Sequence, residues 1–155
     1  MAFIKWQDEF LVGIPKVDEQ HRKLLETIND LHLLLHTRVS PEKLKDIVFF
    51  LNEYVVEHFG TEEALMKAST ALPEKLRERH FREHRFFVDK IQEFTGTLET
   101  ESANKKGYLL DIFEFLGHWF ADHILKIDKE TAAYLRQDRE LRNKNEEESL
   151  PHGNG

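Results

Sequence analysis

Histidine and carboxylate side chains recur along this chain at spacings that suit a metal site. His58 and Glu62 are four residues apart, and so are His80 and His84. On an α-helix, residues four apart lie one turn above each other on the same face, so each pair points into one shared space. The plain alternative is an ordinary, partly buried His58 that is hydrogen-bonded to Glu62. The pair alone does not separate these two interpretations.

Three more side chains complete the candidate set. His21 lies early in the first segment of helical periodicity, and His123 and Asp128 lie late in the last one. The step of five residues turns Asp128 about 140° away from His123 on an ideal helix of 3.6 residues per turn. Asp128 therefore needs a π-bulge, a local unwinding or a side chain that reaches round. Otherwise it is a solvated carboxylate.

Four amphipathic helices are expected to position these side chains. Apolar residues recur at helical spacing over about residues 18–37, 41–67, 73–97 and 104–136. No sustained alternation of apolar and polar residues predicts a strand. Four helices with short links predict an all-α fold, namely an up-down-up-down antiparallel four-helix bundle.

The ends of the elements are also readable in the sequence. Ser40 followed by Pro41 is a strong helix start, and Asp18 is the N-cap candidate of the first helix. We expect an irregular, partly apolar N-terminal arm packed across the domain. Residues 1–137 are assigned to the bundle domain, and residues 138–155, which are charged and then small and polar, to a disordered, flexible C-terminal tail.

The antiparallel arrangement brings the candidate ligands to one level. The start of each helix lies beside the end of the next, and the candidates alternate between early and late positions along the four helices. All seven can therefore meet at the same end of the bundle, which is harder to obtain by chance than any single pair. The set consists of His21, His58, Glu62, His80, His84, His123 and Asp128.

Seven ligands exceed what one metal ion normally takes from a protein. Five imidazoles and two carboxylates suit two metal ions about 3.5–4 Å apart, with the carboxylates bridging them. Because the chain has no cysteine, any metal must bind nitrogen and oxygen. This set suits iron, manganese, zinc or copper, and it argues against calcium or magnesium.

The remaining four histidines are not assigned to the metal site. His32 and His36 are also four apart, but His32 stands about 16 Å along the helix from His21. We expect both at the surface or the core edge. His118 is expected to face outward or to support a ligand, and His152 lies in the tail.

Composition excludes several classes of protein. A charged fraction of 33% with 40% apolar residues indicates a soluble globular domain rather than a disordered chain. The net charge of −7 without a basic patch argues against nucleic acid as a partner. The sequence has neither a membrane-spanning apolar run nor a signal-peptide pattern, so a cytoplasmic location is expected. The motifs of ferritin-like, zincin and serine-nucleophile sites are missing as well.

The ordered set of motifs resembles the bacteriohemerythrins, the single-domain bacterial members of the hemerythrin family. The resemblance covers about Trp6 to Leu135. It rests on Val17-Asp18-Glu19-Gln20-His21, His58-Phe59-x-x-Glu62-Glu63-x-x-Met66, His80-x-x-x-His84 and Trp119-Phe120-x-x-His123-Ile124-x-x-x-Asp128.

The resemblance implies a non-heme di-iron centre that binds O2. One iron would take His80, His84 and His123, and the other would take His21 and His58. Glu62 and Asp128 would bridge the two irons together with an oxo or hydroxo group, which leaves the second iron an open position for O2. Glu63 is rotated about 100° from Glu62 on the helix and should face away.

A dry pocket is needed for reversible O2 binding. Six apolar residues close to the ligands in sequence are candidates for its wall, although such residues also form ordinary cores: Leu24, Phe59, Phe87, Trp119, Phe120 and Ile124. Gly60, between His58 and Glu62, costs about 1 kcal/mol of helix propensity relative to alanine. We expect it to permit close approach of a neighbouring helix or of the metal centre.

The expected function is reversible O2 binding for transport, storage or delivery, without enzymatic activity beyond minor redox reactions. Three alternatives stay open: an oxygen or redox sensor acting through a partner, a di-iron enzyme reducing NO or peroxide, and a purely structural bundle. We expect a monomer. The charged tail after Arg136 is the feature that would recruit a protein partner.

Overall fold

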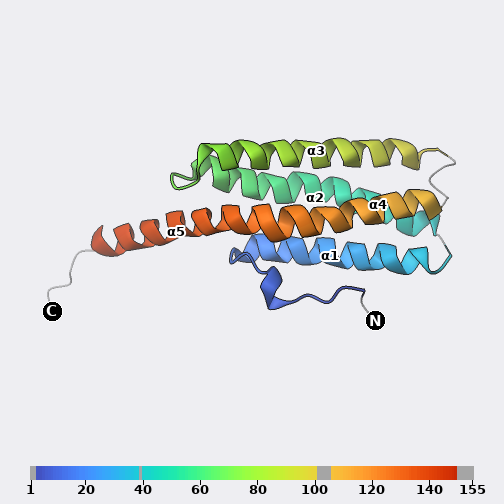
Figure 1. Cartoon of the computed structure of the whole chain (residues 1–155), viewed down its shortest axis with the longest axis horizontal. Coiled ribbons are helices and arrows are strands. Elements are labelled where there is room, and N and C mark those ends of the chain that lie inside the picture. The colour runs from blue at the N-terminus through green and yellow to red at the C-terminus, as the bar shows by residue number, and fades with distance from the viewer. Residues whose placement is uncertain (1–2, 39, 101–105, 150–155) are drawn as a thin grey trace.

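A computed structural model describes residues 3–38, 40–100 and 106–149, with side chains described as far as residue 145. Its helices form an antiparallel up-down-up-down bundle, and no strand occurs in these ranges (Figure 1). The all-α four-helix prediction is confirmed. The bundle has four rod-like helical segments, which we call rods. The first three rods are single helices, namely α1 (Pro15–Leu35), α2 (Pro41–Ala68) and α3 (Glu74–Leu98). The fourth consists of α4 (Lys106–Trp119), the π-helical η3 (Phe120–Asp128) and α5 (Lys129–Ser149).

The first helix begins three residues earlier than predicted. Pro15 occupies the first helical turn, where its missing N–H costs no hydrogen bond, and Ile14 is the N-cap. The N-cap assignment of Asp18 is therefore wrong. Asp18 is buried inside the first turn, and its carboxylate accepts hydrogen bonds from the backbone N–H groups of Val12 (2.7 Å) and Gly13 (3.2 Å). The carboxylate thereby fastens the arm to the helix that carries His21.

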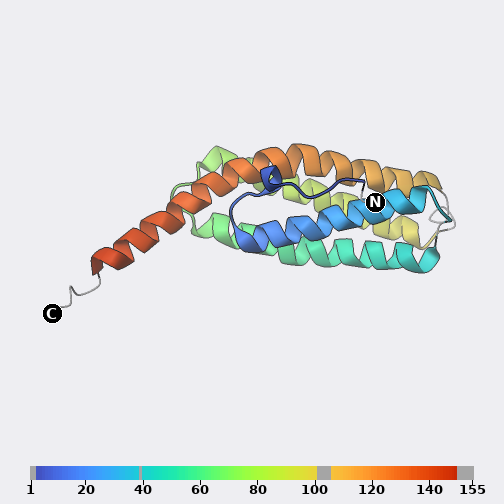
Figure 2. The same cartoon turned by 90° about the horizontal axis from the view of Figure 1, so that it is seen from below.

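Ser40 and Pro41 start α2 as predicted. The Ser40 hydroxyl accepts a hydrogen bond from the backbone N–H of Lys43 at 3.3 Å, which satisfies one of the free donors of the first turn. The links between the rods are short, so successive helices are antiparallel neighbours (Figure 2).

The N-terminal arm packs along the bundle as expected. It contains one turn of 3₁₀ helix, η1 (Asp8–Phe10). Asn29 on α1 exchanges two 2.8 Å hydrogen bonds with the backbone of Ile4, and the Phe10 ring meets the Phe120 ring edge-on at 5.2 Å. These contacts hold the arm over α1 and the π-helical segment.

The π-helical segment explains how Asp128 reaches the same side of the helix as His123. A π-helix pairs residues five apart by hydrogen bonds, so the side chains of His123 and Asp128 come one turn above each other. The segment runs over Phe120–Asp128 and includes both residues. The predicted departure from ideal helical geometry is confirmed.

The fourth rod extends further than predicted. We placed its end near residue 136, but α5 continues to Ser149 and projects past the bundle beyond the α2–α3 link (Figure 2). Leucine, arginine, lysine and glutamate have high helix propensities, which favours continuation of the helix through this charged segment. Residues 150–155 of the predicted tail lie outside the described residues, and the domain boundary at residue 137 stays a prediction.

Asp138 ties the start of this extension to the α2–α3 link. Its carboxylate accepts hydrogen bonds from the hydroxyl groups of Ser69 and Thr70 and from the backbone N–H groups of Thr70 (3.1 Å) and Ala71 (3.0 Å). None of the helices described is both long and apolar enough to cross a bilayer.

Candidate metal centre

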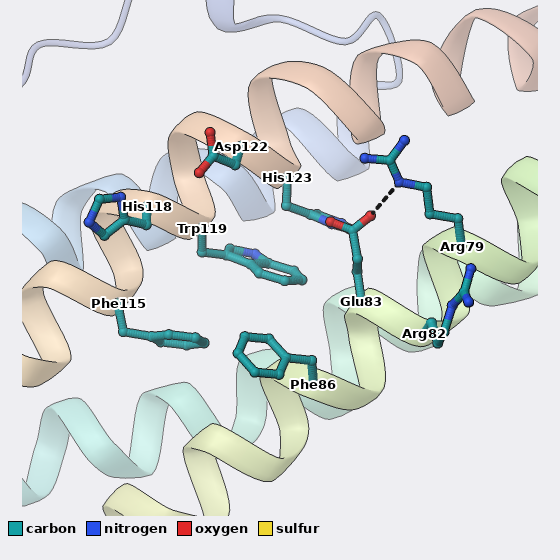
Figure 3. Close-up of a pocket in the computed structure, with 9 residues that line it drawn as sticks. All are labelled: Arg79, Arg82, Glu83, Phe86, Phe115, His118, Trp119, Asp122 and His123. Atoms are coloured by element: carbon teal, nitrogen blue, oxygen red, sulfur yellow. Dashed lines mark ion pairs between the residues drawn. The ribbon is translucent and has the colours of Figure 1, made fainter.

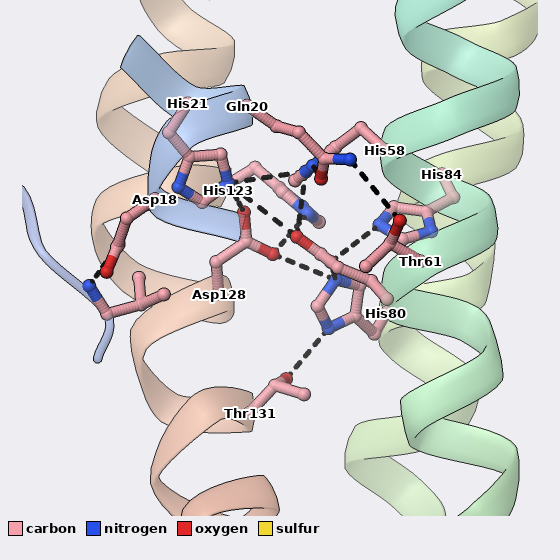
Figure 4. Close-up of polar contacts among 12 residues, drawn as sticks. Asp18, Gln20, His21, His58, Thr61, His80, His84, His123, Asp128 and Thr131 are labelled. Carbon is pink, nitrogen blue, oxygen red and sulfur yellow. Dashed lines mark hydrogen bonds and ion pairs between the residues drawn. The ribbon is translucent and has the colours of Figure 1, made fainter. Parts of the chain in front are cut away.

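Seven buried polar side chains come together between the four helical segments of the bundle, and Figure 4 labels all of them except Glu62. Each is at most 3% exposed. One comes from α1, two from α2, two from α3 and two from η3. The set that the structure brings together is the one that the sequence predicted: His21, His58, Glu62, His80, His84, His123 and Asp128.

The seven side chains divide into two groups that share both carboxylates. Within each group, the candidate ligand atoms lie within 4.8 Å of one another. The larger group adds three imidazoles to the carboxylates, namely His80, His84 and His123, and the smaller group adds two, namely His21 and His58. We call these the three-histidine half and the two-histidine half.

Each shared carboxylate directs one oxygen to each half. Oε1 of Glu62 lies 2.8 Å from Nε2 of His58, while its Oε2 lies 2.8 Å from Nε2 of His80. Oδ2 of Asp128 lies 3.0 Å from Nε2 of His21, while its Oδ1 lies 3.0 Å from Nε2 of His80. This arrangement is suited to two cations bridged by two carboxylates.

The same atoms lack ordinary hydrogen bonds. All four oxygens of Glu62 and Asp128 are buried without a hydrogen-bond partner among the described residues, and so are both ring nitrogens of His84 and His123. Nitrogen and oxygen lone pairs converge instead of being matched with donors. Unpaired buried charge is costly, and bound cations remove that cost. The donor set therefore fits a pair of metal ions.

The electrostatics show a cluster that attracts positive charge. Burial opposes ionisation of Glu62, yet the facing histidines hold its pKa well below the ordinary value. Burial alone would lower the pKa of His21 and of His80. The close, oppositely charged carboxylates of Asp128 and Glu62 outweigh burial and raise these pKa values to about 9 and about 10. The imidazoles of His21 and His80 therefore hold protons that balance part of the negative charge, and binding of metal ions would release these protons.

His84 differs from the other histidines of its half. Burial lowers the pKa of His84 to about 4, so its imidazole is neutral and its lone pair is free to bind a metal. For His123, burial acts downward, but Asp128 and Glu83 raise the pKa overall.

Three outer side chains orient the imidazoles, and the sequence analysis missed all of them. Nδ1 of His58 lies 2.7 Å from Oε1 of Gln20, and Nδ1 of His80 lies 2.7 Å from Oγ1 of Thr131 (Figure 4). Nδ1 of His123 lies 3.5 Å from Oε1 of Glu83. The contacts of His58 and His80 are hydrogen bonds that hold each ring with Nε2 facing Glu62, whereas the contact of His123 with Glu83 is a longer ion-pair contact. For Gln20, the sequence signal that could have indicated a role at the site was its position next to the candidate ligand His21.

Aromatic rings cover three of the imidazoles. Phe59 stacks on His84 at 3.8 Å and Trp119 stacks on His123 at 3.9 Å between ring centroids. Tyr54, another residue that the sequence analysis missed, stacks on His58 at 4.6 Å. The other predicted wall residues are buried in the same core cluster, and their role as a pocket wall stays a prediction: Leu24, Phe87, Phe120 and Ile124.

The expectation for Gly60 is wrong. A Cβ atom built on Gly60 meets nothing within 4 Å, so neither a helix nor the metal site approaches the backbone closely there. Gly60 lies on the exposed side of α2 because the buried side is taken by His58 and Glu62. Glu63, half-buried, belongs to neither ligand group.

The other described histidines lie outside both groups. His32 stacks on the Phe3 ring at 4.1 Å, and the rings of His32 and His36 meet at 4.6 Å near the far end of α1. His118 is exposed on α4. His152 lies outside the described residues.

Comparison with known proteins identifies the family. The model of the hemerythrin HHE cation binding domain matches residues 12–135, which is most of the chain. The chain belongs to the hemerythrin family. The curated bacteriohemerythrin of Clostridium acetobutylicum is 32% identical over 128 residues, covering 81% of this chain and 95% of the relative. That of Stenotrophomonas maltophilia is 31% identical, covering 88% and 84%, and that of Methylococcus capsulatus is 28% identical, covering 83% and 94%.

Membership of the hemerythrin family confirms the resemblance drawn from the motifs and supports non-heme iron as the metal and oxygen binding as the general activity. The matched region includes all seven ligand candidates and ends at the start of the α5 extension.

Proposed function

We propose that this protein binds O2 reversibly at a di-iron centre, as a carrier, store or delivery protein. His80, His84 and His123 would hold one iron, and His21 and His58 the other. Glu62 and Asp128 would bridge them, with an oxo or hydroxo group completing the bridge. The observation that supports this most is that both carboxylates belong to both ligand groups.

The bound iron pair would supply reversible binding of O2, and the unequal numbers of imidazoles indicate where. The two-histidine half has one protein ligand fewer than the three-histidine half. The open position would therefore lie on the side of His21 and His58.

The surrounding side chains exclude water from this position. Tyr54 covers the His58 ring, and Leu24 and Phe59 are at most 3% exposed. We propose that the six predicted apolar wall residues keep the centre dry, because the apolar shell around a metal site controls the access of solvent to it. Gln20 holds the His58 ring in one orientation from the outside.

Metal analysis with optical spectroscopy tests the proposal. The purified protein should contain two iron ions per chain, one for each ligand group. The anaerobically reduced form should gain a visible absorption band in air and lose it under vacuum. A band that never reverts would contradict reversible binding, and multiple turnovers of NO or peroxide with a supplied reductant would favour an enzyme.

A histidine outside the groups provides the matched control. His36 is exposed at the far end of α1, so His36→Ala should leave iron content and the air-dependent band unchanged. Removal of the exposed α5 extension should also leave oxygen binding intact. If removal of the extension abolishes a cellular response but leaves oxygen binding intact, the result would favour an oxygen sensor that acts through a partner.

A further inference from the structure

A surface groove of about 740 Å³ lies beside the three-histidine half, between α3 and the α4–η3 rod (Figure 3). Its volume is within the range of small-molecule sites. It is lined by Arg79, Arg82, Glu83, Phe86, Phe115, His118, Trp119, Asp122 and His123. Neither His21 nor His58, beside which O2 would bind, lines this groove, so the groove needs another explanation.

The walls of the groove are aromatic. Phe86 is 57% exposed, although a phenylalanine is normally buried. Its ring lies 6.0 Å from that of Phe115, and Phe115 in turn lies 6.5 Å from Trp119 with the two ring planes only 27° apart (Figure 3). Such a surface favours a flat aromatic ligand that stacks against the exposed faces of these rings.

The charges at the rim favour an anionic group on that ligand. Glu83 is engaged by Arg79, whose Nε lies 3.4 Å from Oε2, and Asp122 is engaged by Lys126 at 3.3 Å. Arg82 is exposed, and no ion pair between described residues includes it. Its guanidinium offers a planar set of donors suited to a phosphate or a carboxylate.

The groove leads directly to a candidate metal ligand. The Trp119 ring, on the wall of the groove, stacks on the His123 ring at 3.9 Å with an interplanar angle of 11°. Glu83, also on the wall, lies 3.5 Å from Nδ1 of His123. A flat molecule against Trp119 would be separated from the metal centre by two stacked rings.

We propose that this groove binds a planar aromatic anion of the flavin mononucleotide class, which delivers electrons to the metal centre through Trp119 and His123. The electron step rests on the proposed di-iron function, whereas the binding step does not. The reduced flavin gives up two electrons and two protons. Each of two ferric ions takes one electron, and the protons pass to solvent.

Binding is tested by titrating flavin mononucleotide into the iron-loaded protein, followed by calorimetry and by quenching of flavin fluorescence. Phe86→Ala should weaken binding about three- to tenfold by removing a stacking partner. Phe49→Ala, a change at a 65% exposed phenylalanine on α2 away from the groove, should leave binding unchanged. Equal affinities of these two variants, or no binding at millimolar flavin, would overturn the proposal.

The anionic group is tested with riboflavin, which has the same ring system without the phosphate. Arg82→Gln should weaken binding of flavin mononucleotide about two- to fivefold and leave riboflavin unaffected. Arg85→Gln, at an exposed arginine outside the lining of the groove, is the matched control. If Arg82→Gln changes neither ligand, Arg82 does not bind the phosphate and that part of the proposal is wrong.

Electron delivery is tested by anaerobic reduction of the ferric protein with reduced flavin mononucleotide. Phe86→Ala should slow this reduction by at least the factor found for binding at subsaturating flavin, while dithionite, which needs no aromatic surface, should reduce the variant and the parent protein equally. Equal rates with reduced flavin would refute the electron route. If the protein fails to bind iron but still binds flavin in the groove, the proposed di-iron function is refuted and the proposed flavin site is retained.

Discussion

The two halves of the metal centre share their carboxylates but differ in nearly everything around them. The two-histidine half is covered by Tyr54 and supported by the amide of Gln20. The three-histidine half is supported by the hydroxyl of Thr131 and the carboxylate of Glu83. Under the proposed function, the two-histidine half would offer the free coordination position, and the three-histidine half borders the surface groove through His123.

This difference separates two tasks that would compete at a symmetric site. The iron that binds O2 must lie in a dry site and must lack one protein ligand. Electron transfer is favoured instead by closely stacked rings on the half in which no protein ligand is missing. Trp119 on His123 suits the second task. The shared carboxylates couple the halves, because a cation in one half changes the charge seen by the other.

The strongest disruption is therefore expected at a shared carboxylate. Glu62→Gln keeps the side-chain volume but removes the charge that both groups use. Iron content should fall from two ions per chain to less than one, as measured by metal analysis. Glu63→Gln is the control, because Glu63 lies in neither group. Full iron loading of Glu62→Gln would show that Glu62 does not bridge the halves.

A smaller and one-sided effect is expected from removal of a single imidazole. His58→Ala reduces the two-histidine half to one imidazole, so one of the two iron ions should be lost together with the air-dependent band. His84→Ala leaves the other half with two imidazoles and should retain more iron. The iron-to-protein ratio of the two variants, measured side by side, decides the point. Equal losses would show that the halves load as one unit.

The sequence predicted the ligands better than their supports, for a physical reason. Ligand spacing along a helix determines which face a side chain occupies, so His80 and His84 could be paired without a structure. The contacts of Gln20 and Thr131 depend on how an imidazole from another helix is turned, which spacing does not encode. Asp128 was an intermediate case, because its step of five residues predicted a departure from ideal helical geometry without deciding its form, and the form observed is a π-helix.

The errors have equally local causes. Pro15 starts α1 before the better capping residue, Asp18, which binds the arm instead. The segment after residue 137 was interpreted as a tail because it is charged and then small and polar, whereas α5 continues to Ser149. Gly60 was given a packing role because its helical cost suggested one, and its surroundings are empty.

The outer supports should have moderate effects confined to one half. Gln20→Ala removes the acceptor from Nδ1 of His58, and Thr131→Ala removes the partner of Nδ1 of His80. Loss of such a contact typically lowers metal affinity by about 10- to 100-fold. Competition with a graded series of chelators should show that each variant releases one iron ion more readily than the other. Simultaneous release of both ions in both variants would mean that the supports act on the whole centre.

The smallest effect is expected at Gly60, which lies on α2 between His58 and Glu62 but is exposed to solvent. Because a Cβ there meets nothing within 4 Å, Gly60→Ala gains helix propensity without a steric cost. The free energy of unfolding, measured by denaturant titration of the metal-free protein, should rise by up to about 1 kcal/mol. Iron content and oxygen affinity should stay the same. A lower oxygen affinity with normal iron content would show that oxygen binding at the two-histidine half depends on the conformational freedom of the backbone at Gly60.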